Sequence, residues 1–186
     1  MESRSFDSAT LRSGWQFLTY LPMKILGIDP GTATTGWAII EIKGDKLLPL
    51  AYGHISTEKI NSDAERILEV SNDLARIIKK HKPEESAIES LFFFKNQKTV
   101  IQVAQSRGAI LLTLSQNNVK VFSYTPLQVK QALTGYGRAE KKQMQQMIKS
   151  VLHLSCIPKP DDVADALAIA VCHANSRAII SLNRLR

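Results

Sequence analysis

The chain has 186 residues, of which 44% are hydrophobic, and it carries a formal net charge of +7. That length suits one domain of ordinary size and is too short for two comfortable ones. The charge favours a polyanionic partner such as nucleic acid over an acidic small molecule. It is also local, because residues 120–150 hold six Lys and Arg residues against one Glu, whereas residues 1–22 are neutral.

The cysteines and the N-terminus bear on the compartment. Cys156 and Cys172 are too few for a disulfide framework and lack metal-ligand spacing, so the cytoplasm is the expected location. The apolar stretch Trp15–Pro22 is too short to span a membrane and lacks a small-residue cleavage site, so no targeting and no membrane partner are expected. Because Met23 directly precedes the first apolar run, residues 1–22 are either an upstream over-extension of the true start or a loosely held arm.

The first part of the chain predicts three strands. Lys24–Gly31 is a run of Ile and Leu that ends in Pro-Gly, which predicts a buried strand with Asp29 at its end. Thr35–Ile42 predicts a second strand, and the turn at residues 43–46 leads into a third strand over Leu47–Ile55. Three adjacent antiparallel strands are therefore expected.

The middle of the chain alternates between helix and strand patterns. Apolar residues recur at helical spacing from Asp63 to Lys80, which predicts an amphipathic helix covering the sheet. The run Glu-Ser-Ala-Ile-Glu89-Ser then predicts a short strand that delivers this carboxylate at its far end. Gln97–Gln116 predicts a second helix, in which the small residues Ala104 and Gly108 permit close backbone approach to the sheet or to another subunit.

The last third is predominantly helical after one more strand. Val119–Ser123 predicts the fifth strand, and Thr-Pro directly after it is a good helix start. Three helices are predicted: Pro126–Leu133, Ala139–His153, and Asp162 to about Ala174. Residues 176–186 are interpreted as a basic C-terminal tail.

The order of these elements predicts the fold class. Three antiparallel strands followed by βαβ-type crossovers give an α/β fold with a mixed five-stranded sheet flanked by helices. The domain is expected to cover residues 23–175, between the N-terminal extension (1–22) and the C-terminal tail.

Acidic residues stand at three of the predicted element ends. Asp162 and Asp165 are three residues apart, which places both on one face of the final helix. If that helix docks beside the strand ends carrying Asp29 and Glu89, four carboxylates converge and repel one another unless divalent cations neutralise them. Oxygen ligands without a His or Cys cluster suit Mg²⁺ or Mn²⁺, and two such ions support in-line hydrolysis of a phosphodiester.

Each acid also has an ordinary interpretation. Asp29 could start the Asp-Pro-Gly turn, Glu89 could be a solvated strand end, and Asp162 could be a helix cap. Asp165 has the weakest such alternative, because it is set among Ala and Leu one turn into the helix. Asp161 is an ambiguous further candidate.

Several motifs, collinear from Met23 to about His173, resemble those of the RuvC family of Holliday-junction resolvases. They are Gly-Ile-Asp29-Pro-Gly, Ala-Ile-Glu89 followed by Phe92 and Lys95-Asn96, Gln-Val-Lys130-Gln, Ala-Glu-Lys141, and Asp162-Val-Ala-Asp165-Ala-Leu-Ala. The resemblance implies a ribonuclease H-like fold and a homodimer that uses Mg²⁺ to nick two opposing strands of a four-way DNA junction in recombination and repair. It also implies a partnership with the branch-migration helicase complex of the same pathway, and catalytic, metal-binding roles for four acids: Asp29, Glu89, Asp162 and Asp165.

The resemblance further assigns four residues to DNA contact. Phe92 matches the family's aromatic residue that is thought to wedge between bases, where stacking contributes about 1–3 kcal/mol per base. Lys95 lies in the same loop. Lys130 and Lys141 match family lysines near the phosphates, and Lys141 lies close to a predicted helix start, where an anion is also favoured.

Parts of the sequence also fit three other functions. A nuclease with the same fold could trim structured RNA, although the Phe92 loop and the basic segment 120–150 favour branched DNA. An actin-like or sugar-kinase-like ATPase also has a first strand reading Gly-Ile-Asp-x-Gly, but that fold needs duplicated domains and more chain. A junction-binding scaffold without catalysis is disfavoured by the intact set of acids.

Overall fold

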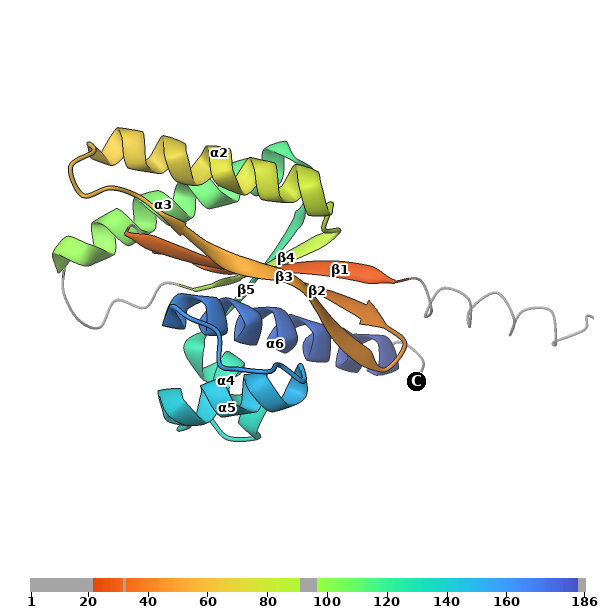
Figure 1. Ribbon diagram of the computed structural model, residues 1–186. Helices are drawn as coiled ribbons and strands as arrows, with labels where there is room; N and C mark the ends of the chain where they lie inside the picture. The colour runs from red at the N-terminus through yellow and green to blue at the C-terminus, as the bar shows by residue number, and fades with distance from the viewer. Residues whose placement is uncertain (1–21, 32, 91–96, 184–186) are drawn as a thin grey trace, which may run out of the picture.

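A computed structural model describes residues 22–31, 33–90 and 97–183, with the backbone alone at 97–99 and 178–183. Within these ranges the chain forms five strands and five helices (Figure 1). In chain order they are β1 (Met23–Asp29), β2 (Thr34–Lys43), β3 (Lys46–Ser56), α2 (Asp63–His81), β4 (Glu85–Glu89), α3 (Gln97–Gln116), β5 (Lys120–Tyr124), α4 (Pro126–Thr134), α5 (Lys141–Val151) and α6 (Asp161–Asn183).

The strands form one mixed sheet in the order β3-β2-β1-β4-β5. The β1–β2 and β2–β3 pairs are antiparallel, whereas the β1–β4 and β4–β5 pairs are parallel. The predicted five-stranded mixed sheet, with three antiparallel strands followed by parallel ones, is therefore confirmed.

Helices cover both faces of this sheet. In Figure 1, α2 and α3 lie above it, while α6 lies below it with α4 and α5 further out. Strand β1 is central, and its side chains alternate between the two layers. Ile25 belongs to the apolar cluster on the α6 side, and Leu26 and Ile28 belong to the cluster beneath α2 and α3. All three are fully buried, which explains why a continuous apolar run forms the middle strand.

Helix α2 begins where its sequence signals place the start. The Ser62 hydroxyl accepts from the backbone N–H of Glu65, and the Glu65 carboxylate accepts from the Ser62 N–H, which is a complete capping box. The apolar stripe Val70, Leu74 and Ile78 is buried against the sheet. The prediction of an amphipathic covering helix is confirmed, with its end at His81 instead of Lys80.

Helix α3 has the predicted bounds, and its small residues do not approach the sheet, which was one of the two partners suggested for them. Ala104 and Gly108 are exposed, and a Cβ built on Gly108 would meet no atom within 4 Å. The sheet is instead faced by Ile110 and Leu114, which are fully buried. The small residues therefore do not contact the sheet, and they lie on an open helix face.

The C-terminal half of the chain shows the largest departures from prediction. Helix α6 continues to Asn183 instead of ending near Ala174, so most of the expected basic tail is helical. The Ser176 hydroxyl bonds the Cys172 carbonyl, and the Arg177 guanidinium pairs with Glu85 on β4, so packing against the sheet extends the helix. No Gly or Pro after Ala174 provides a stop signal.

The bounds of two further elements differ slightly from prediction. Helix α5 covers residues 141–151 instead of 139–153, and β5 is displaced by one residue. The short helix α4 is capped by Thr125 as predicted. Of the helices in the described residues, none combines the length and apolar character needed to cross a bilayer. The interpretation of residues 1–22 falls almost wholly outside the described ranges.

Candidate active site

Two of the predicted acids end neighbouring strands. Strands β1 and β4 are parallel, with Ile28 opposite Ile88, and each strand ends one residue later. Asp29 and Glu89 therefore stand side by side at the same edge of the sheet, and both are half-buried. The carboxyl ends of adjacent parallel strands are a common place for the ligands of an α/β protein to bind.

Two glycines bring the start of α6 to that same edge. Gly36 lies opposite Asp29 in the β1–β2 ladder, and a Cβ on Gly36 would overlap the backbone carbonyl of Asp162. Gly27, further back on β1, likewise faces the Ala166 carbonyl. Because neither glycine has a side chain, the helix lies directly on the sheet, with its acidic first turn beside Asp29.

The charges of the four acids act on one another at this edge. Burial, followed by the charges of Glu89, Asp165 and Asp162, raises the pKa of Asp29 from 3.8 to about 8. Burial and the charge of Asp165 raise the pKa of Glu89 from 4.5 to about 6. The structure therefore brings the four sequence-predicted acids together, as expected if β1, β4 and α6 converge.

Lys141 supplies the nearest positive charge. Its Nζ atom lies 3.5 Å from Oδ2 of Asp165 and 3.3 Å from Oδ2 of Asp161. Burial raises the pKa of Asp165, and the Lys141 ammonium partly offsets that effect. The Lys141 ammonium also lowers the pKa of Asp29. A protein cation thus partly balances the acids from the first residue of α5.

Asp161 has a different environment from the other four acids. Its Oδ1 atom accepts hydrogen bonds from Lys159 at 2.9 Å and from Gln145 at 3.0 Å. The bonds from Lys159 and Lys141 hold its pKa below the ordinary value. Asp161 is therefore already ion-paired, and we interpret it as the anchor of two lysines at the edge of the site.

The four acids brought together by β1, β4 and α6 form a set of donors that fits a hard divalent cation. Its members offer carboxylate oxygens and no thiolate or imidazole, which suits Mg²⁺ or Mn²⁺. In the described part of the chain, no three His, Cys, Asp or Glu side chains are already grouped closely enough to hold a metal ion. Burial, followed by the charges of the neighbouring carboxylates, raises the pKa of Asp29, and a bound cation would offset the part that comes from those charges.

Several residues that fix the acids were not found from the sequence. Arg107 on α3 donates from Nε to the carbonyl of Glu89 at 3.2 Å and from Nη2 to Oγ of Ser123 at 3.0 Å, which ties β4 to β5. Ser106 donates to the Gly31 carbonyl, just after Asp29. Only Gly36 had a readable signal, because a glycine inside a strand indicates close backbone approach.

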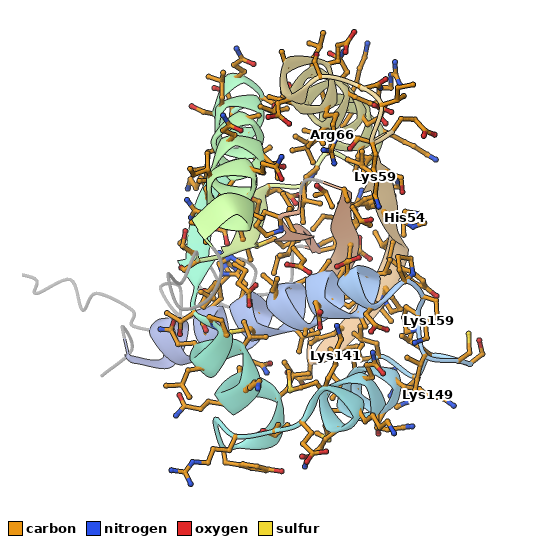
Figure 2. The ribbon with its side chains drawn as sticks, turned by 90° about the vertical axis from the view of Figure 1, so that its left-hand side faces the viewer. His54, Lys59, Arg66, Lys141, Lys149 and Lys159 are labelled. Carbon is orange, nitrogen blue, oxygen red and sulfur yellow. The ribbon has the colours of Figure 1, made fainter. Side chains whose placement is uncertain are left out.

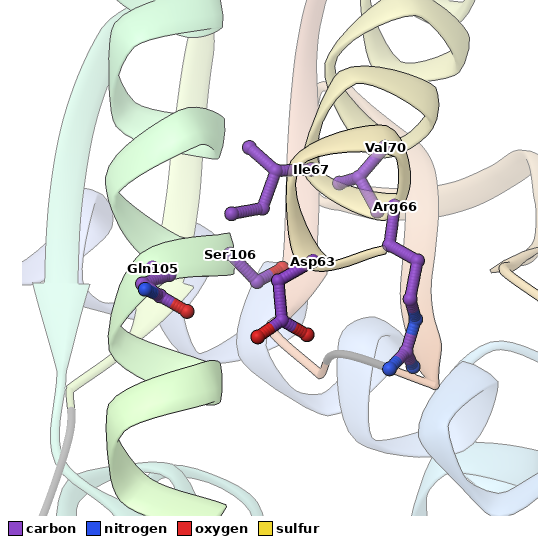
Figure 3. Close-up of a pocket in the computed structure, with 6 residues that line it drawn as sticks. All are labelled: Asp63, Arg66, Ile67, Val70, Gln105 and Ser106. Atoms are coloured by element: carbon purple, nitrogen blue, oxygen red, sulfur yellow. The ribbon is translucent and has the colours of Figure 1, made fainter. Parts of the chain in front are cut away.

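A small pocket between α2 and α3 lies beside this loop (Figure 3). Its walls are formed by Asp63, Arg66, Ile67, Val70, Gln105 and Ser106. Its polar groups are engaged elsewhere, since Arg66 donates to Thr57 and Ser106 donates to Gly31. None of the four acids lines it, so the pocket is separate from the acidic site.

Basic side chains lie on two sides of this end of the molecule. In Figure 2, Lys59 and Arg66 lie on the upper side with His54 near them, whereas Lys141 and Lys159 lie below, near the starts of α5 and α6, with Lys149 in the last turn of α5. An acidic centre between cationic borders is suited to holding a phosphate backbone across the carboxylates.

The four residues assigned to DNA contact have different outcomes. Lys141 lies at the acids, as described above. Lys130 is half-buried on α4, whose contacts with α6 include Cys172 and Asn175, toward the middle of that helix. Phe92 and Lys95 lie outside the described residues.

The comparison with known proteins identifies relatives over most of the chain. The profile of the family described as "Crossover junction endodeoxyribonuclease RuvC" matches residues 25–173. The RuvC endodeoxyribonuclease of Halothermothrix orenii is 53% identical over 154 residues, which cover 83% of this chain and 93% of the relative. That of Fusobacterium nucleatum is 56% identical over 154 residues, which cover 83% of this chain and 81% of the relative.

Solved structures agree with the sequence relatives. Thermus thermophilus RuvC in complex with Holliday junction substrate matches with a TM-score of 0.81 and 33% identity, over 84% of this chain and 96% of that one. The yeast mitochondrial Holliday junction resolvase Ydc2 matches with a TM-score of 0.64 at 16% identity, over 95% of this chain and 88% of that one, which shows the fold alone. The expected ribonuclease H-like fold is confirmed. The chain belongs to the RuvC family of crossover junction endodeoxyribonucleases.

Proposed function

We propose that this chain is a Holliday-junction resolvase that hydrolyses phosphodiester bonds at four-way DNA junctions by paired, symmetric nicks. Membership of the RuvC family supports the activity, and the junction-bound Thermus thermophilus relative supports the substrate. One structural observation carries the chemistry. Carboxylates from two parallel strand ends and from the first turns of α6 act on one another at a single edge of the sheet.

The acids Asp29, Glu89, Asp162 and Asp165 are the proposed ligands of divalent metal, on which the family depends. We assign Mg²⁺ to the site, with two ions per site and with Mn²⁺ able to substitute, because all the donors are hard oxygens. Bound ions would supply an activated water and stabilise the leaving oxygen of the cleaved strand.

The protonation of Asp29 and Glu89 determines whether a proton must be released when a cation binds. With a pKa of about 8, Asp29 holds a proton at neutral pH, and Glu89, at about 6, has largely lost its own. Binding of a cation therefore requires Asp29 to release a proton. Lys141 assists that release because its ammonium favours the charged form of the neighbouring carboxylates.

The cationic borders in Figure 2 are the proposed track for the DNA backbone. Lys141 is placed to neutralise a phosphate next to the acids, and such contacts supply most of the sequence-independent affinity. Phe92 is proposed to wedge between bases at the crossover, with Lys95 on a nearby phosphate. Lys130, from its position on α4, is proposed to contact DNA further from the cut bond.

We also propose that two copies of the chain act together, which paired symmetric nicks require. The open face of α3 supports this proposal, because Ile101 and Leu112 are 63% and 59% exposed and flank the small residues Ala104 and Gly108. Large exposed side chains beside small ones suit close packing of two helices. A cytoplasmic location and cooperation with the branch-migration helicase complex complete the proposal.

The decisive experiment compares substrates of matched sequence. A synthetic four-way junction, a linear duplex and a structured RNA are each incubated with the full chain, with and without Mg²⁺. We expect Mg²⁺-dependent nicking of the junction at symmetric positions and little cleavage of the duplex. Preferential cleavage of the RNA would mean that structured RNA, and not the DNA junction, is the substrate. Junction binding without nicking would mean that the protein is a non-catalytic scaffold.

A further inference from the structure

A buried chain of polar groups lies at the opposite end of β4 from Glu89. His173 on α6 is 1% exposed and Glu85 at the start of β4 is 7% exposed. The Nε2 atom of His173 lies 2.8 Å from Oε2 of Glu85, and its Nδ1 atom lies 2.7 Å from the hydroxyl of Tyr124 on β5. Arg177, one turn further along α6, pairs with the same Oε2 atom at 2.7 Å.

The partners fix the direction of each hydrogen bond in this chain. The Glu85 carboxylate, which pairs with the Arg177 guanidinium, can only accept, so Nε2 of His173 carries the proton. Burial holds the pKa of His173 below its ordinary value, so the ring is neutral and Nδ1 accepts from the Tyr124 hydroxyl. Within the described residues, no buried side-chain nitrogen or oxygen atom lacks a hydrogen-bond partner. The chain is therefore fully satisfied and has one defined arrangement.

The apolar packing of α6 combines a contact of small groups with larger buried side chains such as Leu167 and Ile169. Where α6 crosses β1, it presents Ala166 and Ala170 to Gly27, which forms a smooth contact of small groups. Burial of apolar surface is non-directional, whereas hydrogen bonds require a particular distance and angle. The rings of Phe122 and His173, with centroids 4.4 Å apart and planes inclined at 32°, add a further contact with β5.

We propose that His173 is a positioning residue that sets the register of α6 along β4 and thereby holds Asp165 opposite Glu89. The lengths of the two elements support this. Glu85 and Glu89 are four strand residues apart, or about 13 Å. Asp165 and His173 are eight helix residues apart, or about 12 Å. The hydrogen bond between His173 and Glu85 therefore also aligns Asp165 with Glu89.

Tyr124 connects the same chain of groups to the acidic edge. It lies opposite Glu89 in the β4–β5 ladder, and its carbonyl accepts from the N–H of Ser90 at 2.8 Å. Its side chain reaches back to His173 on the α6 side of the sheet. The position of His173 is thus tied to β4, which carries Glu89, and to the neighbouring strand β5. The proposal rests on the metal-binding role given to the acids above.

The test removes the two hydrogen bonds while keeping an aromatic ring. His173→Phe keeps an aromatic ring beside Phe122, and Glu85 keeps Arg177 as its partner. Val171→Ala is the matched control, because Val171 is buried on the same helix without belonging to the polar chain. His173→Gln is the rescue variant, since its amide offers one donor and one acceptor. Each full-length variant is measured for thermal unfolding, Mn²⁺ binding by electron paramagnetic resonance, and the kcat and KM of junction nicking.

We expect His173→Phe to bind Mn²⁺ about 10-fold more weakly and to lose about 10- to 100-fold in kcat, with KM nearly unchanged, as when a residue supporting metal ligands is removed. Val171→Ala should be destabilised but keep both properties, and His173→Gln should recover part of both. If His173→Phe matches Val171→Ala in Mn²⁺ affinity and kcat, the proposal is wrong. Absence of an Asp29-dependent Mn²⁺ site in the wild-type protein would instead remove the proposed function, and this proposal with it.

Discussion

Gly36 on β2 lies directly against the backbone carbonyl of Asp162 at the start of α6, at a point where any side chain would overlap that carbonyl. The same glycine is the ladder partner of Asp29. One residue without a side chain therefore sets how closely the acids of the helix approach the acid of the central strand.

Gly36→Ala is expected to push the first turn of α6 away from the sheet. Overpacking of this kind costs about 1–3 kcal/mol in the free energy of unfolding. Because Asp162 and Asp165 move with the helix, the rate of metal-dependent nicking should fall more than the folded fraction does. Chemical unfolding and junction cleavage measure the two effects.

The control for that variant lies on the other face of the sheet. Leu74 on α2 is fully buried there, so Leu74→Ala should lose about 2–5 kcal/mol without moving α6. Its nicking rate per folded molecule should equal that of the wild type. Equal rates per folded molecule in Gly36→Ala would show that the close approach matters for folding alone.

Asp29→Asn is expected to reduce Mg²⁺-dependent nicking of a four-way junction by more than about 100-fold. Removing a residue that only supports a metal ligand costs up to about 100-fold, and the loss of a ligand should cost more. Junction binding should stay largely intact, because the phosphate contacts come from the basic borders. Gel-shift assays in the absence of Mg²⁺ and cleavage assays in its presence separate the two properties. Full cutting by this variant would remove the metal-ligand role of Asp29.

The same substitution has the opposite effect on the stability of the metal-free protein. The pKa of Asp29 is 3.8 unperturbed and about 8 when folded, so the folded state binds the proton more tightly. Its contribution to stability is therefore fully present below pH 3.8 and is lost as the pH rises to about 8. Asp29→Asn should be more stable than the wild type at pH 8, by on the order of a few kcal/mol.

Thermal unfolding in the presence of a chelator, from pH 5 to pH 9, tests that prediction. The stability advantage of Asp29→Asn should grow with pH and level off above about 8. Addition of Mn²⁺ at pH 8 should reverse the order, because a cation stabilises only the wild-type site. A constant difference across the pH range would mean that Asp29 titrates normally.

Lys141→Gln is expected to shift the pH dependence of nicking toward higher pH. Lys141 is the cation that lowers the pKa of Asp29 and Asp165, so its loss makes both carboxylates hold their protons to higher pH. The nicking rate should fall several-fold at pH 7 and recover partly at pH 9. Lys142→Gln, which removes an exposed lysine from the next position, should leave the profile unchanged.

Leu112→Glu is expected to weaken association of two chains through α3. Loss of a well-packed anchor costs about 2 kcal/mol or more, which raises the dimer dissociation constant about 30-fold. Sedimentation equilibrium measures it. Leu68→Glu is the matched control, because Leu68 on α2 is 60% exposed against 59% for Leu112 but does not lie on α3. Equal dimerisation of both variants would place the contact elsewhere.

The sequence predicted the sheet because local signals and burial agree along it. The apolar run ending at Asp29 became the buried central strand, and the Gly44 turn, with a φ of +59°, joined β2 to β3 as the hairpin pattern indicated. The acids were predictable for a related reason. A carboxylate at the end of an apolar strand stands out, whereas a lysine on a helix face does not.

Other features depend on contacts between distant residues and had no local signal. Helix α6 extends beyond Ala174 because Arg177 reaches Glu85, which is far away in the chain. Arg107 looked like any helical arginine until its contacts with Glu89 and Ser123 were seen. Lys130 matched a motif, but nothing in the sequence around it indicated that its helix packs alongside the middle of α6.

The place of α6 in the chain order limits when the enzyme can act. Two of its four acids and much of the apolar cluster beneath the sheet come from this helix, which is the last described element. A polypeptide still being synthesised therefore has Asp29 and Glu89 but no complete acidic site. The proposed metal site is therefore complete only after α6 has been synthesised and has docked on the sheet.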